Sequence, residues 1–295
     1  MDGAKAEAAT SAAIAVNGDA RADADAGSGG TLPLQRARGR LELTVKAVDG
    51  RTRLADLHQA GCLKLRFPKV AGALSEAVVI NTSGGLTGGD RLQQRFAAGP
   101  GAELSLTTQA CERIYRASAG RAEVSTDLKI GAGGFLAWLP QETILFDEGA
   151  LRRRLDVEAA DDARFVLCES VILGREMMGE SVLRGNFHES WRVRCGGQLV
   201  FADETRLDGA IATAAKAGAS LGGNRAFATL VARLDAPESA LGAIRAILGD
   251  SGGASVVDGL VVARLVAPSG FLLRRRLIPA IAALAQGAVP RLWSL

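Results

Sequence analysis

The sequence predicts a mainly β protein, and three features of its pattern support that class. Apolar and polar residues alternate with a period of two in many short segments, glycine-rich turns separate these segments, and helical spacing appears only late in the chain. Because successive side chains of a strand point to opposite faces, each such segment buries one face and exposes the other to solvent. Many short strands joined by glycine turns are typical of a mainly β architecture.

The alternating segments begin at about residue 38. Leu41, Leu43 and Val45 alternate there with polar residues. The same alternation groups Leu63, Leu65 and Phe67, then Leu104 and Leu106, Leu128 and Ile130, Phe135, Ala137 and Leu139, and Trp191 and Val193. We therefore expect these side chains to lie on the buried faces of strands.

Helical spacing is confined to the C-terminal part. Apolar residues recur at this spacing over 241–248, shortly after Pro237, which suits a first helical turn. A second helix is predicted over 270–286, interrupted by Pro279, and residues 260–266 indicate a buried strand between the two. The predicted fold is thus mainly β, with a few helices mostly in the C-terminal part.

The chain opens with a segment rich in Ala, Asp and Gly, residues 1–37. Large apolar side chains are nearly absent there, so ordering it would cost more conformational entropy than burial returns. No linker-like composition and no clean internal repeat follows residue 40. We expect a disordered tail over 1–37 and a single β-rich domain over 38–295.

Composition argues against several classes of partner. The formal net charge of +3 is too small to indicate nucleic acid or membrane, and 4% aromatic residues are too few for a base-stacking platform. No apolar stretch has the length of a signal peptide or a membrane span, and the four cysteines form no C-x-x-C pair. We expect a cytoplasmic protein with reduced thiols. The arginine runs 152–154 and 274–276 are expected on solvated faces.

Few residues suit catalysis or tight metal binding. Histidine occurs only at His58 and His188, and no G-x-S-x-G nucleophile motif is present. The spacing of His58 and Cys62 lacks the further ligands of a zinc site. A pair of the many carboxylates could form a glycosidase-like site, so a β-rich carboxylate hydrolase is the alternative to a binding protein. The low aromatic content speaks against a sugar-binding groove.

The glycine cluster at residues 84–89 contains neither the Gly-Lys-Ser/Thr of a phosphate loop nor the G-x-G-x-x-G spacing of a dinucleotide site. We interpret it as a pair of tight turns that need positive φ, with Asp90 closing the second turn.

Five motifs follow one another in a fixed order. They are S-G-G-L-T-G-G-D at 83–90, Q-A-C-E-R-I-Y-R at 109–116, W-L-P-Q-E at 138–142, L-G-R at 173–175 with M-G-E at 178–180, and P-R-L-W at 290–293. Together they resemble the urease accessory protein UreD family, called UreH in some organisms. The motif residues are Gly84, Gly85, Gly88, Gly89, Asp90, Tyr115, Arg116, Trp138, Leu139, Pro140, Gln141, Glu142, Gly174, Arg175, Gly179, Glu180, Pro290, Arg291 and Trp293. The long tail, and Arg91 where relatives can carry an acid, depart from the pattern.

The resemblance implies an elongated, β-helix-like stack of strands and no catalytic activity. It implies binding to the urease apoprotein and to UreF, which recruits UreG, so that nickel enters the urease active site. No cofactor is implied as tightly bound, and nickel is present only in transit through the interior. The resemblance also admits a dimer of this chain within the complex.

A conduit must release its cation, and scattered oxygen ligands suit that better than a Cys/His cage. The conduit candidates are Asp90 and Glu142, which lie in matched motifs, and Glu169 and Asp203, which align less firmly with acidic family positions. The segments 138–142 and 290–293 are candidate partner surfaces, because Trp is enriched at binding hot spots. A core role for Trp138, and docking of Trp293 onto the domain's own core, remain as alternatives.

Overall fold

The structure is a computed structural model that describes residues 35–69, 74–285 and 289–293. Residues from Arg36 onward form one compact unit. The predicted tail, residues 1–37, lies outside the described residues except for its last three. The backbone N–H of Ala37 donates to Asp90 Oδ1 at 2.7 Å, so the chain is already part of the compact unit at that point.

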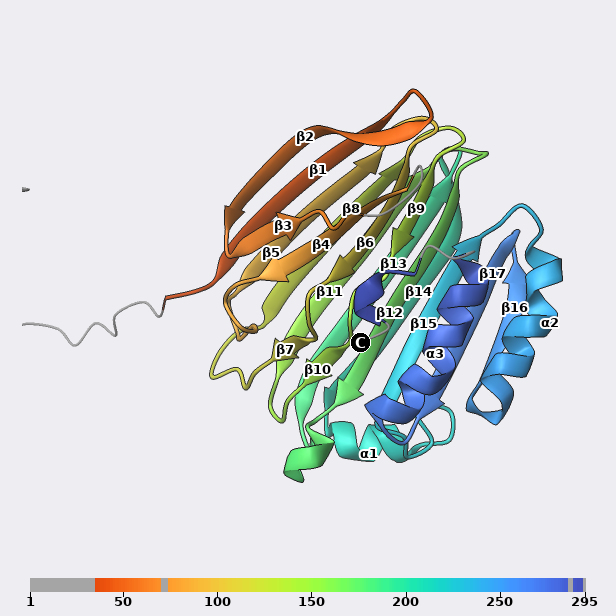
Figure 1. Cartoon of the computed structure of the whole chain (residues 1–295). Helices are drawn as coiled ribbons and strands as arrows, with labels where there is room; N and C mark the ends of the chain where they lie inside the picture. Colours follow the sequence, from red (N-terminus) through yellow and green to blue (C-terminus); the bar gives the residue numbers. More distant parts are fainter. Residues whose placement is uncertain (1–34, 70–73, 286–288, 294–295) are drawn as a thin grey trace, which may run out of the picture. The chain divides into compact units, whose positions relative to one another are not determined.

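Sheet A has seven strands in the order β14-β13-β11-β8-β5-β1-β2 (Figure 1). Its strands are β1 (Arg38–Val48), β2 (Arg51–Gly61), β5 (Arg91–Ala98), β8 (Ala122–Ile130), β11 (Ala150–Ala159), β13 (Gly185–Cys195) and β14 (Gln198–Gly209). The five central strands run parallel, and an antiparallel hairpin closes each edge.

Sheet B has ten strands, eight of them in the order β16-β17-β15-β12-β9-β6-β4-β3. The remaining two, β7 and β10, pair with each other and join the sheet through β12. Its strands are β3 (Leu63–Arg66), β4 (Ser75–Asn81), β6 (Glu103–Thr108), β7 (Glu112–Ile114), β9 (Phe135–Trp138), β10 (Thr143–Leu145), β12 (Arg164–Leu173), β15 (Ala226–Arg233), β16 (Gly252–Val257) and β17 (Leu260–Ala267).

From β4 to β13 the chain passes back and forth between the two sheets, so that strands two or three positions apart in chain order become parallel neighbours. This winding confirms the expected β-helix-like stack.

The helices are α1 (Ile211–Lys216), α2 (Pro237–Leu248) and α3 (Gly270–Leu284), with short 3-10 turns at Glu176–Met178, Gly249–Ser251 and Arg291–Trp293. Both helices predicted from spacing are present, and α2 and α3 lie against sheet B (Figure 1). Helix α3 is not interrupted at Pro279. Its buried face, with Leu277, Ile281 and Leu284, continues past the proline, and that burial offsets the lost backbone hydrogen bond.

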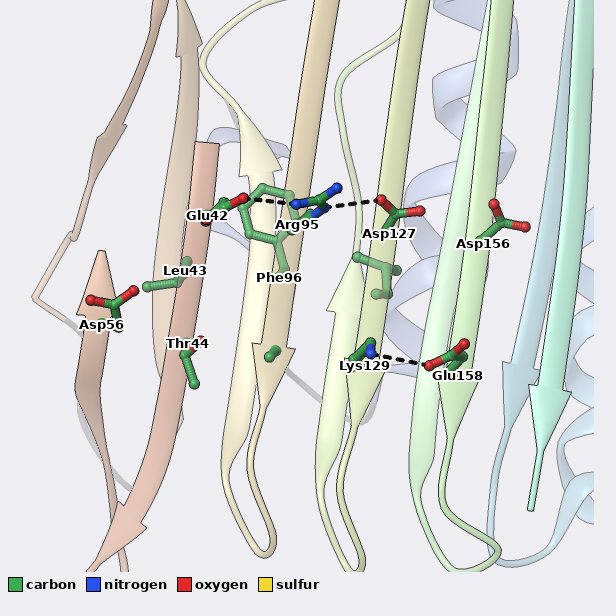
Figure 2. A pocket seen from close by; sticks show the side chains of 12 residues that line it. Glu42, Leu43, Thr44, Asp56, Arg95, Phe96, Asp127, Lys129, Asp156 and Glu158 are labelled. Atoms are coloured by element: carbon green, nitrogen blue, oxygen red, sulfur yellow. Dashed lines mark hydrogen bonds and ion pairs between the residues drawn. The ribbon is translucent and has the colours of Figure 1, made fainter. Parts of the chain in front are cut away.

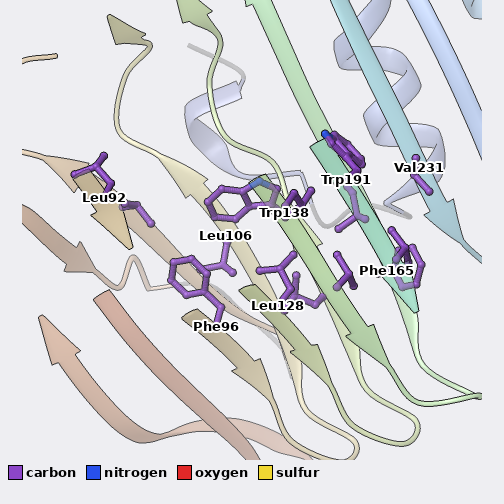
Figure 3. Close-up of a cluster of buried hydrophobic side chains, with 14 of the residues drawn as sticks. Leu92, Phe96, Leu106, Leu128, Trp138, Phe165, Trp191 and Val231 are labelled. Carbon is purple, nitrogen blue, oxygen red and sulfur yellow. The ribbon is translucent and has the colours of Figure 1, made fainter. Parts of the chain in front are cut away.

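Two apolar layers hold the fold together. One lies between the sheets and includes Phe96, Trp138 and Trp191, which Figure 3 shows with their neighbours. The other lies between sheet B and the helices α2 and α3. Strand β9 contributes side chains to both layers, because all four of its residues are buried.

The residues predicted to face the core are buried, with one exception. Phe67 is 40% exposed. Strand β3 ends at Arg66, so the alternation that groups Phe67 with Leu63 and Leu65 does not extend to it.

Candidate functional site

The glycine-rich motif forms tight turns between β4 and β5, as predicted. Gly85 has φ +145°, and a Cβ there would lie 2.4 Å from the Tyr115 ring. The hydroxyl of Tyr115 donates to the carbonyl of Gly84 at 3.1 Å. The tyrosine of the second motif therefore packs onto the glycines of the first, which leave room for its ring.

Asp90 closes the second turn. Its Oδ2 accepts the backbone N–H of Thr87 at 2.8 Å, and its Oδ1 accepts that of Ala37 at 2.7 Å. Both carboxylate oxygens are thus held by backbone groups of two different segments. This position gives Asp90 a structural role in joining the turn to the start of β1.

The motifs at 109–116 and 173–180 meet on one ring, that of Phe146. Tyr115 contacts Phe146 edge-on, with 5.1 Å between ring centroids, and the Arg175 guanidinium lies 4.5 Å from the same ring. Arg175 also pairs with Glu180 at 2.8 Å. Arg116 pairs with Glu148, and Gly174 and Gly179 have positive φ. We call the surface formed by Tyr115, Arg116, Phe146, Arg175 and Glu180 the motif rim.

The motifs at 138–142 and 290–293 are joined through Arg274 of α3. Arg274 Nη1 donates to Glu142 at 2.9 Å, and its guanidinium lies 5.0 Å from the Trp293 ring. Trp293 Nε1 donates to the carbonyl of Leu139 at 2.8 Å. Trp293 is buried, as expected for a terminus docked on its own core, and Trp138 is buried as well. Neither indole is exposed to a partner.

The two arginine runs are only partly solvated, which corrects the sequence interpretation. Arg152 and Arg154 are exposed, but Arg153 is buried in the core between the sheets. Strand alternation turns every second residue of β11 inward, and residue 153 shares that parity with Leu151 and Leu155. In the second run Arg274 is half-buried in its ion pair with Glu142.

Buried and partly buried polar side chains extend across the inter-sheet core, and we call this set of residues the polar band. Sheet A contributes Gln94, Thr126, Arg153, Glu189 and Asp203, and sheet B contributes Thr108, Glu112, Thr143, Glu169 and Thr229. The strand register aligns several of them, since Gln94 is opposite Thr126, Glu112 opposite Thr143, and Glu169 opposite Thr229. Buried polar groups are costly without partners, so such a row needs an explanation.

The centre of the polar band is an ionic cluster that joins the two sheets. Arg153 Nη1 lies 2.7 Å from Glu169 Oε2, and Arg153 Nε donates to Glu189 Oε1 at 2.6 Å. Arg153 Nη1 also donates to Thr143 Oγ1 at 2.7 Å. Trp138 Nε1 donates to Glu169 Oε1 at 2.9 Å, which fixes the carboxylate from the other side.

Cavities lie along the polar band. A cavity of about 50 Å³ is lined by Arg153, Glu169 and Glu112, and one of about 140 Å³ by Glu112 and Cys111; both are also lined by Gln94. Gln94 Oε1 is buried and has no hydrogen-bond partner among the residues that the structure describes. The two cavities share Gln94, Thr108 and Glu112 in their linings, and together they extend from the ionic cluster to the turn at Gly84 and Gly85.

The opposite end of the polar band reaches a groove of about 420 Å³ between β14 and β17. Its lining includes Thr229, which is opposite Glu169, and Thr205, which is opposite Glu189. Asp203 lies beside this groove and pairs with Arg264 across the two sheets.

Burial raises the pKa of three groups along the polar band. It raises the pKa of Glu112 to about 7, although the hydrogen bonds from Asn81 lower that pKa. It raises the pKa of Glu169 to about 7 as well, and the charge of Glu189 adds to this while Arg153 opposes it. Burial and then Glu142 raise the pKa of Cys111 to about 12, so its thiol stays protonated and is a poor metal ligand at neutral pH.

The structure separates the four carboxylates proposed from the sequence. Glu169 and Asp203 lie in the polar band, whereas Asp90 holds a turn and Glu142 faces Arg274. Within the described ranges, no three or more His, Cys, Asp or Glu side chains gather closely enough to hold a metal ion. Sequence reasoning missed Arg153 and Glu189, although both share the parity of apolar neighbours on their strands.

A further hollow lies on the outer face of sheet A. It measures about 520 Å³ and is lined mainly by charged residues of β1, β5, β8 and β11 (Figure 2). Arg95 pairs there with Glu42 and Asp127, and Lys129 pairs with Glu158. These exposed ion pairs neutralise one another's charge and contribute little to stability.

Across the described ranges, every helix is too short or too polar to cross a bilayer.

The chain is similar to known proteins over most of its length. The family model described as "UreD urease accessory protein" matches residues 37–294. The chain is 52% identical over 268 residues to the urease accessory protein UreD of Rhizobium johnstonii, covering 90% of this chain and 98% of that protein. It is 48% identical over 262 residues to the UreD of Agrobacterium fabrum, covering 88% and 92%. The chain belongs to the UreD family of urease accessory proteins.

Proposed function

We propose that this protein is a cytoplasmic scaffold that binds the urease apoprotein together with UreF and UreG, and that nickel crosses it along the polar band on its way to the urease active site. The observation that carries this proposal is the row of carboxylates, amides and hydroxyls through an otherwise apolar core. A purely structural core would fill these positions with apolar side chains, which cost less to bury.

The chemistry of the polar band suits a cation in transit. Its donors are oxygen atoms spread along the route, and the nearby thiol of Cys111 has its pKa raised to about 12. Such donors hold a divalent cation weakly, whereas a cage of thiolates and imidazoles would retain nickel. The proposed stations are Glu112, Glu169, Glu189 and Asp203, in that order from the glycine turn to the groove.

Asp90 and Glu142 are assigned to positioning. Each already has its carboxylate occupied, by backbone N–H groups or by Arg274. Replacing either by alanine would disturb the turn or the docking of α3, so a loss of function would not report on nickel alone.

The hydrolase alternative is less compatible with the geometry around the buried carboxylates of the polar band. The cavity beside Glu169 measures about 50 Å³, whereas ligand sites span roughly 300–1,000 Å³. Glu169 and Glu189 are also both engaged by Arg153. We therefore propose a role without catalysis, and a hydrolase assay on the purified chain is a direct check.

The motif rim is the proposed partner-facing surface. Tyr115 is 37% exposed there, and Met178 and Leu183 nearby are 72% and 59% exposed. Exposed apolar side chains beside ordered charged groups are typical of protein-binding surfaces.

The test is co-expression with urease, UreF and UreG. The variant E112Q/E169Q/D203N removes charge along the polar band and keeps side-chain volume. We expect it to co-purify with its partners as the wild type does, while urease contains less nickel. The matched control is E123Q/E158Q, which changes exposed carboxylates of the outer face. Full nickel loading by the band variant would reject the conduit, and failure of the wild-type chain to co-purify with urease would reject the scaffold.

A further inference from the structure

Arg153 occupies a place in the polar band where a fixed positive charge is unexpected for a cation route. Of the described residues that line the cavity of about 50 Å³, it is the sole cation. It pairs with both Glu169 and Glu189. These carboxylates are the register partners of Thr229 and Thr205, which line the groove, so Arg153 is bound at the point where the cavity side of the polar band meets the groove side.

We propose that Arg153 is an internal gate, whose guanidinium occupies between Glu169 and Glu189 the position that a divalent cation takes in transit. The cation passes only by displacing the guanidinium. This inference rests on the proposed function and adds to it the regulation of the route.

Charge balance supports an exchangeable guanidinium. Two carboxylates face one arginine, so the cluster carries a net charge of −1 when both are ionised, and a divalent cation in place of the arginine would neutralise the pair. Glu169 and Glu189 come from different sheets, so both can turn toward an ion between them. The oxygen donors Thr143 Oγ1 and Gln94 Oε1 face the same space, and Gln94 Oε1 has no partner within the described part of the chain.

The displaced guanidinium can remain in contact with the Phe187 ring. Arg153 already lies 5.9 Å from the centre of the Phe187 ring, and an arginine over an aromatic face is stabilised without a carboxylate. Because the displaced arginine stays close, its charge repels the cation and keeps binding weak. The gate is therefore closed when no cation is present and returns to that state after release.

The first test is nickel-dependent thermal unfolding of the full chain. In R153M the two carboxylates have no guanidinium between them, so NiCl₂ at about 100 times the dissociation constant should raise Tm by roughly 5–10 °C. The triple variant R153M/E169Q/E189Q should show no such rise, and the wild type a smaller one than R153M. Equal rises in R153M and the triple variant, or in R153M and the wild type, would overturn the gate.

Should R153M fail to fold, R153K carries the same test. Lysine keeps the charge but presents a single point donor in place of the arginine fork, so it holds the two carboxylates less well. Its nickel-dependent rise should exceed that of the wild type. A rise no larger than that of the wild type would count against the gate.

The second test is nickel loading of urease on co-expression. E189Q leaves Arg153 paired with Glu169 and removes one ligand of the displaced state, so urease nickel should fall while co-purification is unchanged. Omission of the whole chain is the reference. If omission leaves urease nickel unchanged, the proposed function fails. If omission lowers nickel but E189Q does not, the gate fails together with the assignment of Glu189 as a station, while the scaffold role stands.

Discussion

Arg153 joins two buried carboxylates, and its removal should cost much more than removal of its neighbour on the same strand. We expect R153M to lower the free energy of unfolding by about 3–5 kcal/mol, because Glu169 and Glu189 would be left buried without a counter-charge. R152M is the matched control, because Arg152 is exposed, and it should change stability by less than about 0.5 kcal/mol. Urea denaturation measures both. Equal effects would show that the cluster is not stabilised by its arginine.

Glu112 and Glu169 make stability depend on pH in an unusual direction. Their pKa values are about 7 in the folded chain, above the ordinary value of 4.5, so the folded state holds more protons between these pH values. Their contribution to the free energy of unfolding therefore falls as pH rises from about 4.5 to 7. Thermal unfolding between pH 5 and 8 should show a flatter profile for E112Q/E169Q than for the wild type. Parallel profiles would contradict the raised pKa values.

Single residues differ in how far the sequence could place them. Asp90 follows a glycine pair, and its turn-closing role follows from local chemistry. Arg153 lies between two other arginines, and a run of like charges ordinarily indicates a solvated face. Only the strand parity shared with Leu151 and Leu155 indicates burial, and its two acidic partners come from segments more than ten residues away. Such partners depend on how strands stack, which a local pattern does not specify.

The turn between β4 and β5 contains two adjacent glycines with different constraints. A Cβ at Gly85 would lie 2.4 Å from the Tyr115 ring and 2.8 Å from the carbonyl of Arg113, at φ +145°. At Gly84 the φ is +77° and the space is open. We expect G85A to destabilise by roughly 2–3 kcal/mol through strain and overpacking, and G84A by only about 1 kcal/mol. Denaturation midpoints compare the two, and equal losses would argue against packing of Tyr115 onto the turn.

The contact between α3 and the segment after β9 should behave as one coupled unit. R274M leaves the buried Glu142 carboxylate without its ion pair, and we expect a loss of about 3 kcal/mol or more. E142Q should cost less, because Arg274 is half-exposed and still donates to Gln141. The double variant should be more stable than the sum of the single losses predicts. Additive losses in a double-mutant cycle would show that the pair does not couple the helix to the sheet.

At the scale of elements, local patterns located seven of the seventeen strands and two of the three α-helices that the structure describes, but not which elements lie next to one another. The alternation at 41–45 and the helical spacing over 241–248 each depend on one buried face, which the sequence displays directly. Strand β9 is buried on both faces, so its alternation does not distinguish the layer between the sheets from the layer under the helices. The β-helix-like stack followed from resemblance to a family and not from periodicity, and the order of the strands was not predicted.

Across the whole molecule, the winding between two sheets explains why a polar band can exist. Because successive strands alternate between the sheets, residues of the same parity point into the core on each strand. Polar residues at matching positions on these strands therefore form a row across the core. Gln94 and Thr126 are register partners on β5 and β8, and Arg153 and Glu189 are register partners on β11 and β13. None of these residues is near another in sequence, and the row was therefore not predictable from local motifs.

The segment that precedes the compact unit should not be needed for its function. The family match begins at residue 37, and the Rhizobium johnstonii relative aligns over 98% of its own length with 90% of this chain. Deletion of residues 1–34 should leave the denaturation midpoint, co-purification with urease and nickel loading unchanged. Deletion of residues 1–40 should lower stability, because it removes the Ala37 N–H that Asp90 accepts and the first residues of β1. Loss of nickel loading in the shorter deletion, with stability intact, would assign the segment a role in assembly.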